Sequence, residues 1–387
     1  MKKMVLKDFK IMSENINKNI KNVFSEKDLL FSERESSYER FLDLGLPNKR
    51  IEDWKYTGFS KLNKFLSQDI LDVTFRLKKD HDQDAEILDL DFSKINSNDY
   101  VKPQNYVKNE AIINLNLALS SQFKVIDIKN SQKRPIVIFL DTTEEGMFLP
   151  RIYINVFEGV SAEILIINAG LKGFINQLVE FNLGKNSKLI LNRVNFSETA
   201  FIETNISYLK KGSCLNITNL SIPKDTSRYQ GYNFFEEEEA IYDFKSISIP
   251  RQNSNDDILT KNFHGSSSCS SSSGIRAVLG EKTVSTFQSL VDVKRGTKNT
   301  IAEQDCKAIL LSKNATMNAK PQMKIFNDNV VCKHGVTIGS LDSNQIFYML
   351  TRGLNEEEVR NFLIKTFIDS YISNDSILKK YLPGNFQ

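Results

Sequence analysis

Short runs in which apolar residues alternate with other residues recur along most of the chain, beginning at about Pro135. They are Ile136 to Leu140, Ile152 to Val156, Ile164 to Ile166, Leu189 to Leu191, Leu215 to Ile217 and Leu290 to Val293. A period of two places every second side chain on one face of a strand. Each run therefore predicts a β-strand with one buried face.

Turn-forming residues separate these runs at roughly regular intervals. They are Gly159, Lys172-Gly173, Gly184 to Ser187, Lys211 to Ser213, Arg295-Gly296 and Lys313-Asn314. No helical period intervenes, so the pattern predicts an all-β domain. A sandwich, a barrel and a solenoid are all compatible with it, although the regular spacing favours the stacked coils of a solenoid.

The chain before about residue 100 has a helical and strongly charged pattern. Ser13 to Phe24 and Ser32 to Leu44 combine mixed charges with scattered apolar positions. Gly45-Leu46-Pro47 ends this pattern, because a Gly followed closely by a Pro stops a helix. Trp54 is the only Trp of the chain, and we interpret it as a packing anchor.

The chain after Asp342 returns to a helical period. Asp342 or Ser343 can cap a short helix that ends at Gly353. Asn355 starts a second helix, with Glu358 placed to complete a capping box. This helix carries an i, i+3, i+4, i+7 stripe of Val359, Phe362, Leu363, Thr366, Phe367 and Tyr371. Such a stripe packs into a core or docks in the groove of a partner, and the pattern leaves both open.

Composition excludes several classes of protein. The 387 residues carry 51 basic and 48 acidic side chains, a balance that does not predict nucleic-acid binding. The four cysteines have no disulfide-like pattern, which favours a reducing compartment. The start MKKMVLKDFKIMSEN lacks the apolar core of a signal peptide, and no apolar run is long enough to span a bilayer. We therefore expect a cytoplasmic chain with no membrane partner.

Two low-complexity stretches interrupt the β pattern. Glu236 to Glu239 predicts a solvated acidic turn. Ser266 to Ser273, which includes Cys269, predicts a flexible loop between coils. His264 and Cys269 are metal-ligand types, but ordering a serine-rich backbone costs too much entropy to preorganise a site.

Cys332 and His334 are the residues with the strongest chemical potential. Met323 to Val331 suggests extended backbone, so Cys332 and His334 should share one face of a strand and Lys333 the other. A thiolate and an imidazole at this spacing can share a metal ion or face a partner together. Two ligands do not fill a tetrahedral site, and a buried Cys beside a structural His is the alternative.

The whole stretch KPQMKIFNDNVVCKHGVTIGSLDSNQIFYMLTRGL, from Lys320 to Leu354, resembles the C-terminal signature of the SufD branch of the SufB/SufD family. A second, distant segment, Glu52-Asp-Trp-Lys-Tyr-Thr57, is similar to the N-terminal segment of the same branch. SufB proteins carry His-Glu-Ala where this chain has His334-Gly335-Val336. The resemblance implies a right-handed parallel β-helix over residues 110–342, with helical domains over 1–109 and 343–387.

The same resemblance implies a non-catalytic scaffold subunit of the SUF iron–sulfur cluster assembly complex. Its partners would be SufB, through the ends of the two β-helices, and the ATPase SufC, through the C-terminal helices. Iron or a nascent iron–sulfur cluster would be held transiently at the SufB interface by His334, with Cys332 beside it. The SufC-docking residues would be Phe347, Leu350, Arg352, Gly353, Val359, Phe362, Leu363 and Phe367.

No phosphate-binding loop occurs in the sequence, because Gly335 to Ser340 lacks both the spacing and the lysine of that motif. The ATPase is therefore expected to be a separate protein. Two alternatives stay open: a SufB-like or homomeric cluster scaffold, and a β-helical enzyme acting on polysaccharides. The second needs a clustered acid–base pair, and Asp292 with Lys294 is the nearest approach to one.

Overall fold

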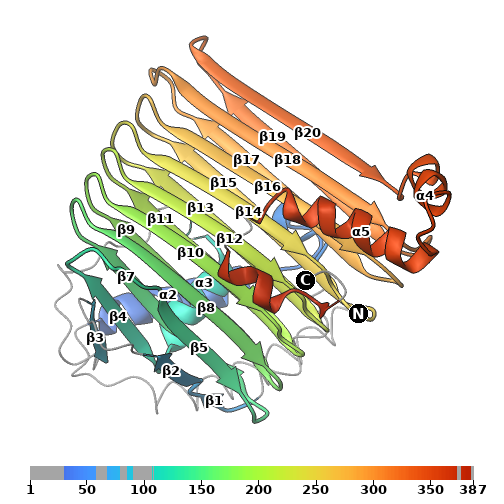
Figure 1. The fold of residues 1–387 in the computed structure, drawn as a ribbon. Coiled ribbons are helices and arrows are strands. Elements are labelled where there is room, and N and C mark those ends of the chain that lie inside the picture. The colour runs from blue at the N-terminus through green and yellow to red at the C-terminus, as the bar shows by residue number, and fades with distance from the viewer. Residues whose placement is uncertain are drawn as a thin grey trace.

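The computed structural model describes residues 30–57, 68–78, 85–89, 107, 109–372 and 376–384. These residues form a mainly β structure with helices toward both ends of the chain (Figure 1). The predicted fold class is thereby confirmed. The helix expected over Ser13 to Phe24 lies outside the described residues.

Two long sheets make up the core, and along most of the chain successive strands alternate between them. Sheet A holds β1 (Ile70–Leu71), β3 (Ala85–Asp89), β4 (Phe123–Ile128), β6 (Met147–Phe148), β7 (Arg151–Val156), β9 (Phe174–Leu183), β11 (Ala200–Leu209), β13 (Thr226–Phe235), β15 (Asn255–His264), β17 (Val284–Val293) and β19 (Thr316–Ile325). Sheet B holds β2 (Thr74–Lys78), β5 (Ile136–Thr142), β8 (Ser161–Gly170), β10 (Lys188–Asn195), β12 (Cys214–Ser221), β14 (Ile241–Ser248), β16 (Ser270–Leu279), β18 (Thr300–Leu310) and β20 (Val330–Gly339).

Neighbouring strands pair in parallel within both sheets, except that β2 and β3 pair antiparallel with β5 and β4. A chain that returns to the same sheet one coil later, always in parallel, forms a β-solenoid. The regular spacing of turns along the sequence reflects this geometry, because each turn carries the chain from one sheet to the other.

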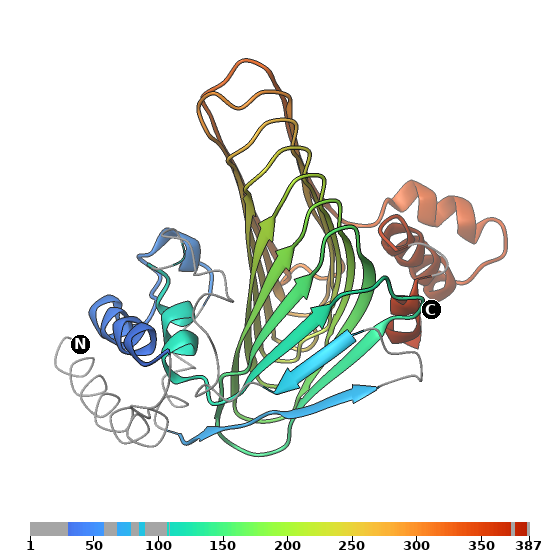
Figure 2. The same cartoon turned by 90° about the vertical axis from the view of Figure 1, so that its left-hand side faces the viewer.

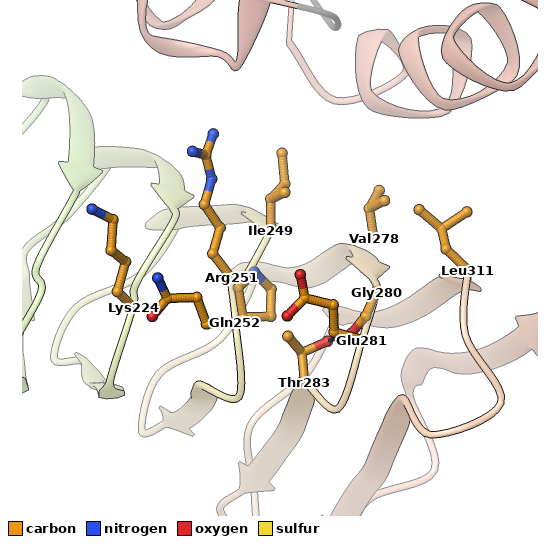
Figure 3. A pocket seen from close by; sticks show the side chains of 10 residues that line it. Lys224, Ile249, Arg251, Gln252, Val278, Gly280, Glu281, Thr283 and Leu311 are labelled. Carbon is orange, nitrogen blue, oxygen red and sulfur yellow. Dashed lines mark hydrogen bonds between the residues drawn. The ribbon is translucent and has the colours of Figure 1, made fainter. Parts of the chain in front are cut away.

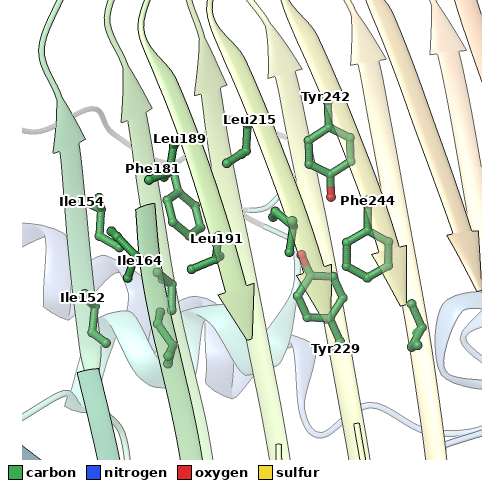
Figure 4. Packing of buried hydrophobic residues seen from close by; sticks show 14 of the residues in the cluster. Ile152, Ile154, Ile164, Phe181, Leu189, Leu191, Leu215, Tyr229, Tyr242 and Phe244 are labelled. Carbon is green, nitrogen blue, oxygen red and sulfur yellow. The ribbon is translucent and has the colours of Figure 1, made fainter. Parts of the chain in front are cut away.

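The space between the sheets is filled by the side chains that alternate inward on each strand. Ile152, Ile164, Phe181 and Leu191 are fully buried there (Figure 4). In-register pairing stacks equivalent residues of successive coils, so that Leu189, Leu215 and Tyr242 form one row. Apolar residues at these positions hold the coils together by removing hydrocarbon surface from water.

The N-terminal elements cover the outer face of sheet A. They are α2 (Phe31–Leu44), the 3-10 helix η1 (Glu52–Trp54) and α3 (Ala111–Leu119), and they lie to one side of the solenoid (Figure 2). Phe41, Trp54 and Leu115 share a buried cluster with Ala200 and Ile202 of β11. Trp54 is 1% exposed, which confirms it as a packing anchor.

Two expectations for this region were wrong. β1, β2 and β3 are strands in a stretch that we expected to be helical, and they are so short that no period is visible in their sequence. Conversely, α3 is a helix just after residue 110, where strands were expected. Its sequence, AIINLNLAL, is apolar on nearly all sides and almost wholly buried, so it shows no helical stripe.

The serine-rich stretch is also not a flexible loop. Ser270 to Leu279 forms β16, and the side chains of Ser271 and Ser273 point inward and are buried. Ser273 accepts a hydrogen bond from Asn262 at 3.1 Å, and Ser271 lies 2.8 Å from the His264 ring. The neighbouring coils therefore supply the partners that order this stretch. Glu236 to Glu239 lie in the turn after β13, with Glu236, Glu238 and Glu239 exposed.

The C-terminal elements cover the outer face of sheet B, on the opposite side of the solenoid from the N-terminal ones (Figure 2). They are α4 (Ser343–Leu350), α5 (Glu356–Asp369) and the 3-10 helix η4 (Ile377–Tyr381). Asp342 caps α4 by accepting a hydrogen bond from the Asn344 amide, and Asn355 and Glu358 form the capping box of α5. Both predicted helix starts are confirmed.

Candidate functional site

The solenoid is open at the end formed by the last coil. β19 pairs only with β17 and β20 only with β18, so both strands are sheet edges in the described part of the chain. Four apolar side chains there are well exposed: Phe326, Val331, Val336 and Ile338. Free backbone groups beside exposed apolar side chains are features of a surface that binds another chain.

Cys332 and His334 lie on β20 at this open end. They pair in register with Ala302 and Gln304 of β18, two inward-facing residues that are each 1% exposed. Lys333 points to the outer face and forms an ion pair with Glu303 at 3.2 Å. The predicted alternation of faces is therefore confirmed. Cys332 packs at the edge of a small cluster and is half-buried, whereas His334 is exposed.

The two side chains differ as ligands. Burial raises the pKa of the Cys332 thiol above its ordinary value, against a smaller opposite effect of a backbone hydrogen bond from Ala302. A raised pKa keeps the sulfur protonated, and the thiol is a poor ligand until a metal displaces that proton. The imidazole of His334, by contrast, is exposed to solvent and open to a partner.

No group of three or more His, Cys, Asp or Glu residues within the described ranges could hold a metal ion. Cys332 and His334 therefore supply at most two ligands, and four are usual for tetrahedral iron or zinc. A metal ion bound here must complete its ligand set with non-protein ligands or with residues of a second chain.

Cys269, Cys306 and His264 belong to the interior, whereas Cys214 is half-buried at the start of β12. Burial raises the pKa of the Cys306 thiol to about 12 and raises the pKa of the Cys269 thiol as well. Burial lowers the pKa of His264 to about 4, and its ring stacks on Phe235 at 4.2 Å. All four cysteines are free, and none of these buried groups is placed to reach a partner.

The C-terminal helices present an exposed apolar surface, which we call the α4 surface: Phe347, Tyr348, Leu350, Leu354 and Phe362. Phe347 is 69% exposed and Phe362 is 54% exposed. No residue of α4 is buried, although α4 and α5 contact each other. Arg352 and Gly353, in the connection between the two helices, are also exposed, and Leu363 is half-buried.

The rest of the α5 stripe packs onto this chain itself. Ile364, Ile368 and Ile372 share a buried cluster with outward-facing apolar residues of sheet B, such as Leu220 and Ile247. Phe367 packs at the margin of the same cluster, and Val359 is fully buried. Val359 and Phe367 were expected to dock a partner; in this chain Val359 is buried, whereas Phe367 is half-buried and keeps part of its surface exposed.

A polar cluster that sequence reasoning missed fixes the end of α5 to sheet B. Arg276 donates to Asp305 at 2.6 Å, and its guanidinium lies 4.0 Å from the centre of the Tyr371 ring. The Tyr371 hydroxyl donates to the same Asp305 carboxylate at 3.2 Å. It lies over Gly274, where an added Cβ would stand 2.1 Å from the hydroxyl oxygen. Gly274, the last residue of the SSSSG run, leaves room for this contact because it has no side chain.

The Glu52 to Thr57 segment attaches the N-terminal region to sheet A. The Arg228 guanidinium lies 3.9 Å from the Trp54 ring centre and donates to the Asp53 carbonyl at 2.8 Å. Lys261 forms an ion pair with the Asp53 carboxylate at 2.5 Å. The residues of this motif are therefore used in attachment.

A pocket of about 340 Å³ lies among the turns that follow the strands of sheet B (Figure 3). Lys224, Arg251 and Glu281 contribute mixed charges, and Val278 and Leu311 an apolar wall. None of the three charged side chains is buried. The buried polar residue in the lining, Thr283, already donates its hydroxyl to the Gly280 carbonyl at 2.7 Å, so the pocket has no free buried polar group to select a ligand.

Within the described residues, no helix is long and apolar enough to cross a membrane.

Residues 139–367 match a family model described as the SufBD core domain of the SUF system of iron–sulfur cluster assembly. An iron–sulfur cluster assembly SufBD family protein of Synechocystis is 25% identical, with 89% of this chain and 87% of the relative covered.

Two further relatives match over shorter stretches. The iron–sulfur cluster assembly protein SufD of Escherichia coli is 30% identical over 32% of this chain and 29% of its own length. SufD of Bacillus subtilis is 25% identical over 33% of this chain and 29% of its own length. Because the matched domain covers more than half of the 387 residues and contains the open end, the chain belongs to the SufBD family of the SUF iron–sulfur cluster assembly system.

Proposed function

We propose that the chain is a non-catalytic scaffold subunit that pairs with SufB through the open end of its solenoid and binds the ATPase SufC through the α4 surface. The observation that carries the proposal is the coincidence of two free sheet edges with His334 and Cys332 on the same terminal strand. Each half of the proposal has its own structural support.

The pairing half rests on what the open end exposes. Val336 and Ile338 face the interior of the solenoid, yet they are 45% and 41% exposed because no further coil covers them. A second solenoid placed end to end would cover these side chains and pair the free backbone groups of β19 and β20. A metal ion held by His334 would then lie between the two chains.

The cargo would be iron or a nascent iron–sulfur cluster, which the scaffold holds and passes on. His334 would supply an imidazole nitrogen, and the Cys332 thiol would follow if a metal displaces its proton. SufB would supply the remaining ligands. An incomplete ligand set on this chain suits a transient cargo, because binding is tight only while both chains are in place.

The ATPase half rests on the α4 surface. Its exposed side chains are large and apolar, in contrast to the charged remainder of α5, such as Glu356, Glu357 and Arg360. A helix pair with an apolar exposed face fits a hydrophobic groove of a partner. The absence of a phosphate-binding loop in the sequence assigns ATP hydrolysis to that partner.

The test is co-purification of the tagged chain with untagged SufB and SufC. We expect Val336→Asp to abolish SufB binding and spare SufC, and Phe347→Asp to do the reverse. Leu171→Asp is the matched control, because Leu171 is an exposed apolar residue, 50% accessible, in a turn far along the chain from both surfaces.

Retention of both partners by both variants would contradict the proposal. Light scattering on the wild-type chain alone tests the homomeric alternative. A stable dimer that Val336→Asp dissociates, combined with no binding of SufB, would replace the heteromeric scaffold by a homomeric one.

A further inference from the structure

Gln304 lies directly beneath the candidate ligand at the open end. It pairs in register with His334 on the adjacent strand, and both side chains belong to the inner row that also contains Ser273. Gln304 is 1% exposed, so its amide cannot turn to bulk water for hydrogen bonds. Every polar atom of this side chain therefore needs a partner inside the solenoid.

The amide nitrogen of Gln304 has its partners. It donates to Ser289 Oγ at 3.0 Å and to the Gln322 carbonyl at 3.1 Å, two acceptors on sheet A across the interior. These two bonds use both hydrogens of the NH2 group and hold the amide nitrogen against sheet A. The orientation of the amide is thus set from sheet A.

The amide oxygen of Gln304 has no partner among the described residues, although it is buried. Two residues flank Gln304 in its row. Ser273, on one side, accepts from Asn262 at 3.1 Å and leaves the Gln304 oxygen without a bond. The imidazole of His334, on the other side, likewise has no hydrogen-bond partner among the described residues. An unused acceptor and an unused imidazole N–H are therefore direct neighbours in the ladder.

We propose that Gln304 is the positioning residue of His334: its side-chain oxygen accepts the N–H of one imidazole nitrogen and so presents the other nitrogen to the open end. The inference rests on the proposed function, because it gives a role to the ligand named there. Metal-binding histidines usually have the second ring nitrogen held by an acceptor, which fixes both the tautomer and the ring orientation. Gln304 is the neighbour of His334 with a free acceptor.

The tautomer of His334 is the direct readout. The chain has 3 histidines, His81, His264 and His334, so labelling with ¹⁵N-histidine gives few signals, and each can be assigned by a His→Gln variant. In the full-length wild-type chain we expect one neutral tautomer of His334 to dominate. In Gln304→Met, which keeps the length of the side chain but has no acceptor, the two tautomers should approach the ratio of free histidine.

Gln304→Glu tests the acceptor separately from the donor. A carboxylate retains an acceptor oxygen but loses the NH2 group that binds Ser289 and Gln322, so the tautomer bias should persist. Ser273→Ala is the matched control on the other side of Gln304 and should leave His334 unchanged. The His264 signal reports whether the interior remains folded, since that ring stays beside Ser271 in all of these variants.

An identical tautomer ratio in the wild type and in Gln304→Met, with the His264 signal intact, would overturn the inference. Because this readout uses the isolated chain, it does not depend on any partner or cluster. Iron binding by the complex with SufB is the second readout, and loss of the acceptor should weaken it about 10-fold or more. If His334→Ala left iron binding intact, the proposed site would fail while the tautomer result stood.

Discussion

His334 and Cys332 share a face of β20 but have different surroundings, and the difference predicts their relative importance. We expect His334→Ala to leave assembly with SufB and SufC intact, since one exposed imidazole adds little to a large interface. Cluster formation in the assembled complex should fall severely. Cys332→Ser should have a milder effect, because burial raises the pKa of this thiol and makes it the poorer ligand. Cluster absorbance and iron content of reconstituted complexes measure both effects, and a wild-type yield with His334→Ala would show that the residue is structural.

Gly274 makes a second residue-level prediction. A Cβ at this position would overlap the Tyr371 hydroxyl, so Gly274→Ala must displace the Tyr371 ring from its contacts with Asp305 and Arg276. We expect a loss of roughly 1–3 kcal/mol in the free energy of unfolding, the usual cost of overpacking. Urea unfolding measures it.

Gly280→Ala is the control for this prediction, because nothing lies within 4 Å of a Cβ there. In a Tyr371→Phe background, which lacks the hydroxyl, the Gly274→Ala substitution should cost distinctly less. Equal costs in both backgrounds would show that the hydroxyl contact is not the cause.

His264 predicts how stability depends on pH. Burial lowers its pKa to about 4, whereas an unfolded histidine titrates near 6.5. The unfolded chain therefore binds a proton that the folded chain does not, and stability falls as the pH drops from about 6.5 toward 4. At 1.36 kcal/mol per pKa unit, the loss approaches about 3 kcal/mol at the acid end.

Urea unfolding of the wild type and of His264→Gln between pH 7.5 and 4.5 isolates this effect, because all other groups are shared. As the pH falls, the unfolding free energy of the wild type should decrease relative to that of His264→Gln. A difference that stays constant with pH would mean that the pKa of His264 is the same in the folded and unfolded chains.

At the level of elements, the α5 helix divides its apolar residues between two roles. Ile368 is fully buried against sheet B, whereas Phe362 is 54% exposed. Ile368→Ala should cost about 2–5 kcal/mol of stability, the usual range for a buried aliphatic side chain. Phe362→Ala should change stability little and weaken SufC binding. Thermal unfolding and a SufC binding assay on the same two variants separate the roles, and the reverse pattern would place the docking face on the other side of α5.

Local patterns predicted many elements well and failed where tertiary contacts decide. The alternation of apolar residues was enough to place β5, β7 and β8, and the side-chain chemistry of Asp342, Asn355 and Glu358 was enough to start α4 and α5. The serine-rich β16 was missed because its hydrogen-bond partners, such as Asn262, come from another coil.

Parts of the candidate site could not be predicted from the sequence, for a similar reason. The shared face of Cys332 and His334 follows from the period of a strand, and it is correct. The sequence could not decide whether the apolar stripe of α5 packs on this chain or docks a partner. The reason is that outward positions of sheet B, such as Leu165, Val194 and Leu220, are apolar too. A strand that is apolar on both faces does not reveal in its sequence which helix covers it. Nothing in the sequence distinguished Gln304, because the lack of a partner for its side-chain oxygen appears only once the coils are packed together.

For the molecule as a whole, helices lie on both outer faces of the solenoid and leave the end at β19 and β20 free (Figure 2). This arrangement separates the two proposed partner surfaces. The α4 surface lies on the sheet B side, and the open end lies across the last coil of both sheets. The two proposed surfaces therefore use different residues of the chain.

The open end also bears on how the chain behaves in the absence of a partner. In a solenoid each coil is stabilised by its neighbours, and the last coil has a neighbour on one side only. Its amides should therefore exchange with deuterium sooner than those of the central coils and become protected when a partner arrives. A copy left alone would present a fraying coil and two unsatisfied sheet edges to every other copy. The supply of such a chain in the cell should accordingly be matched to that of its partner, because any excess is a seed for aggregation.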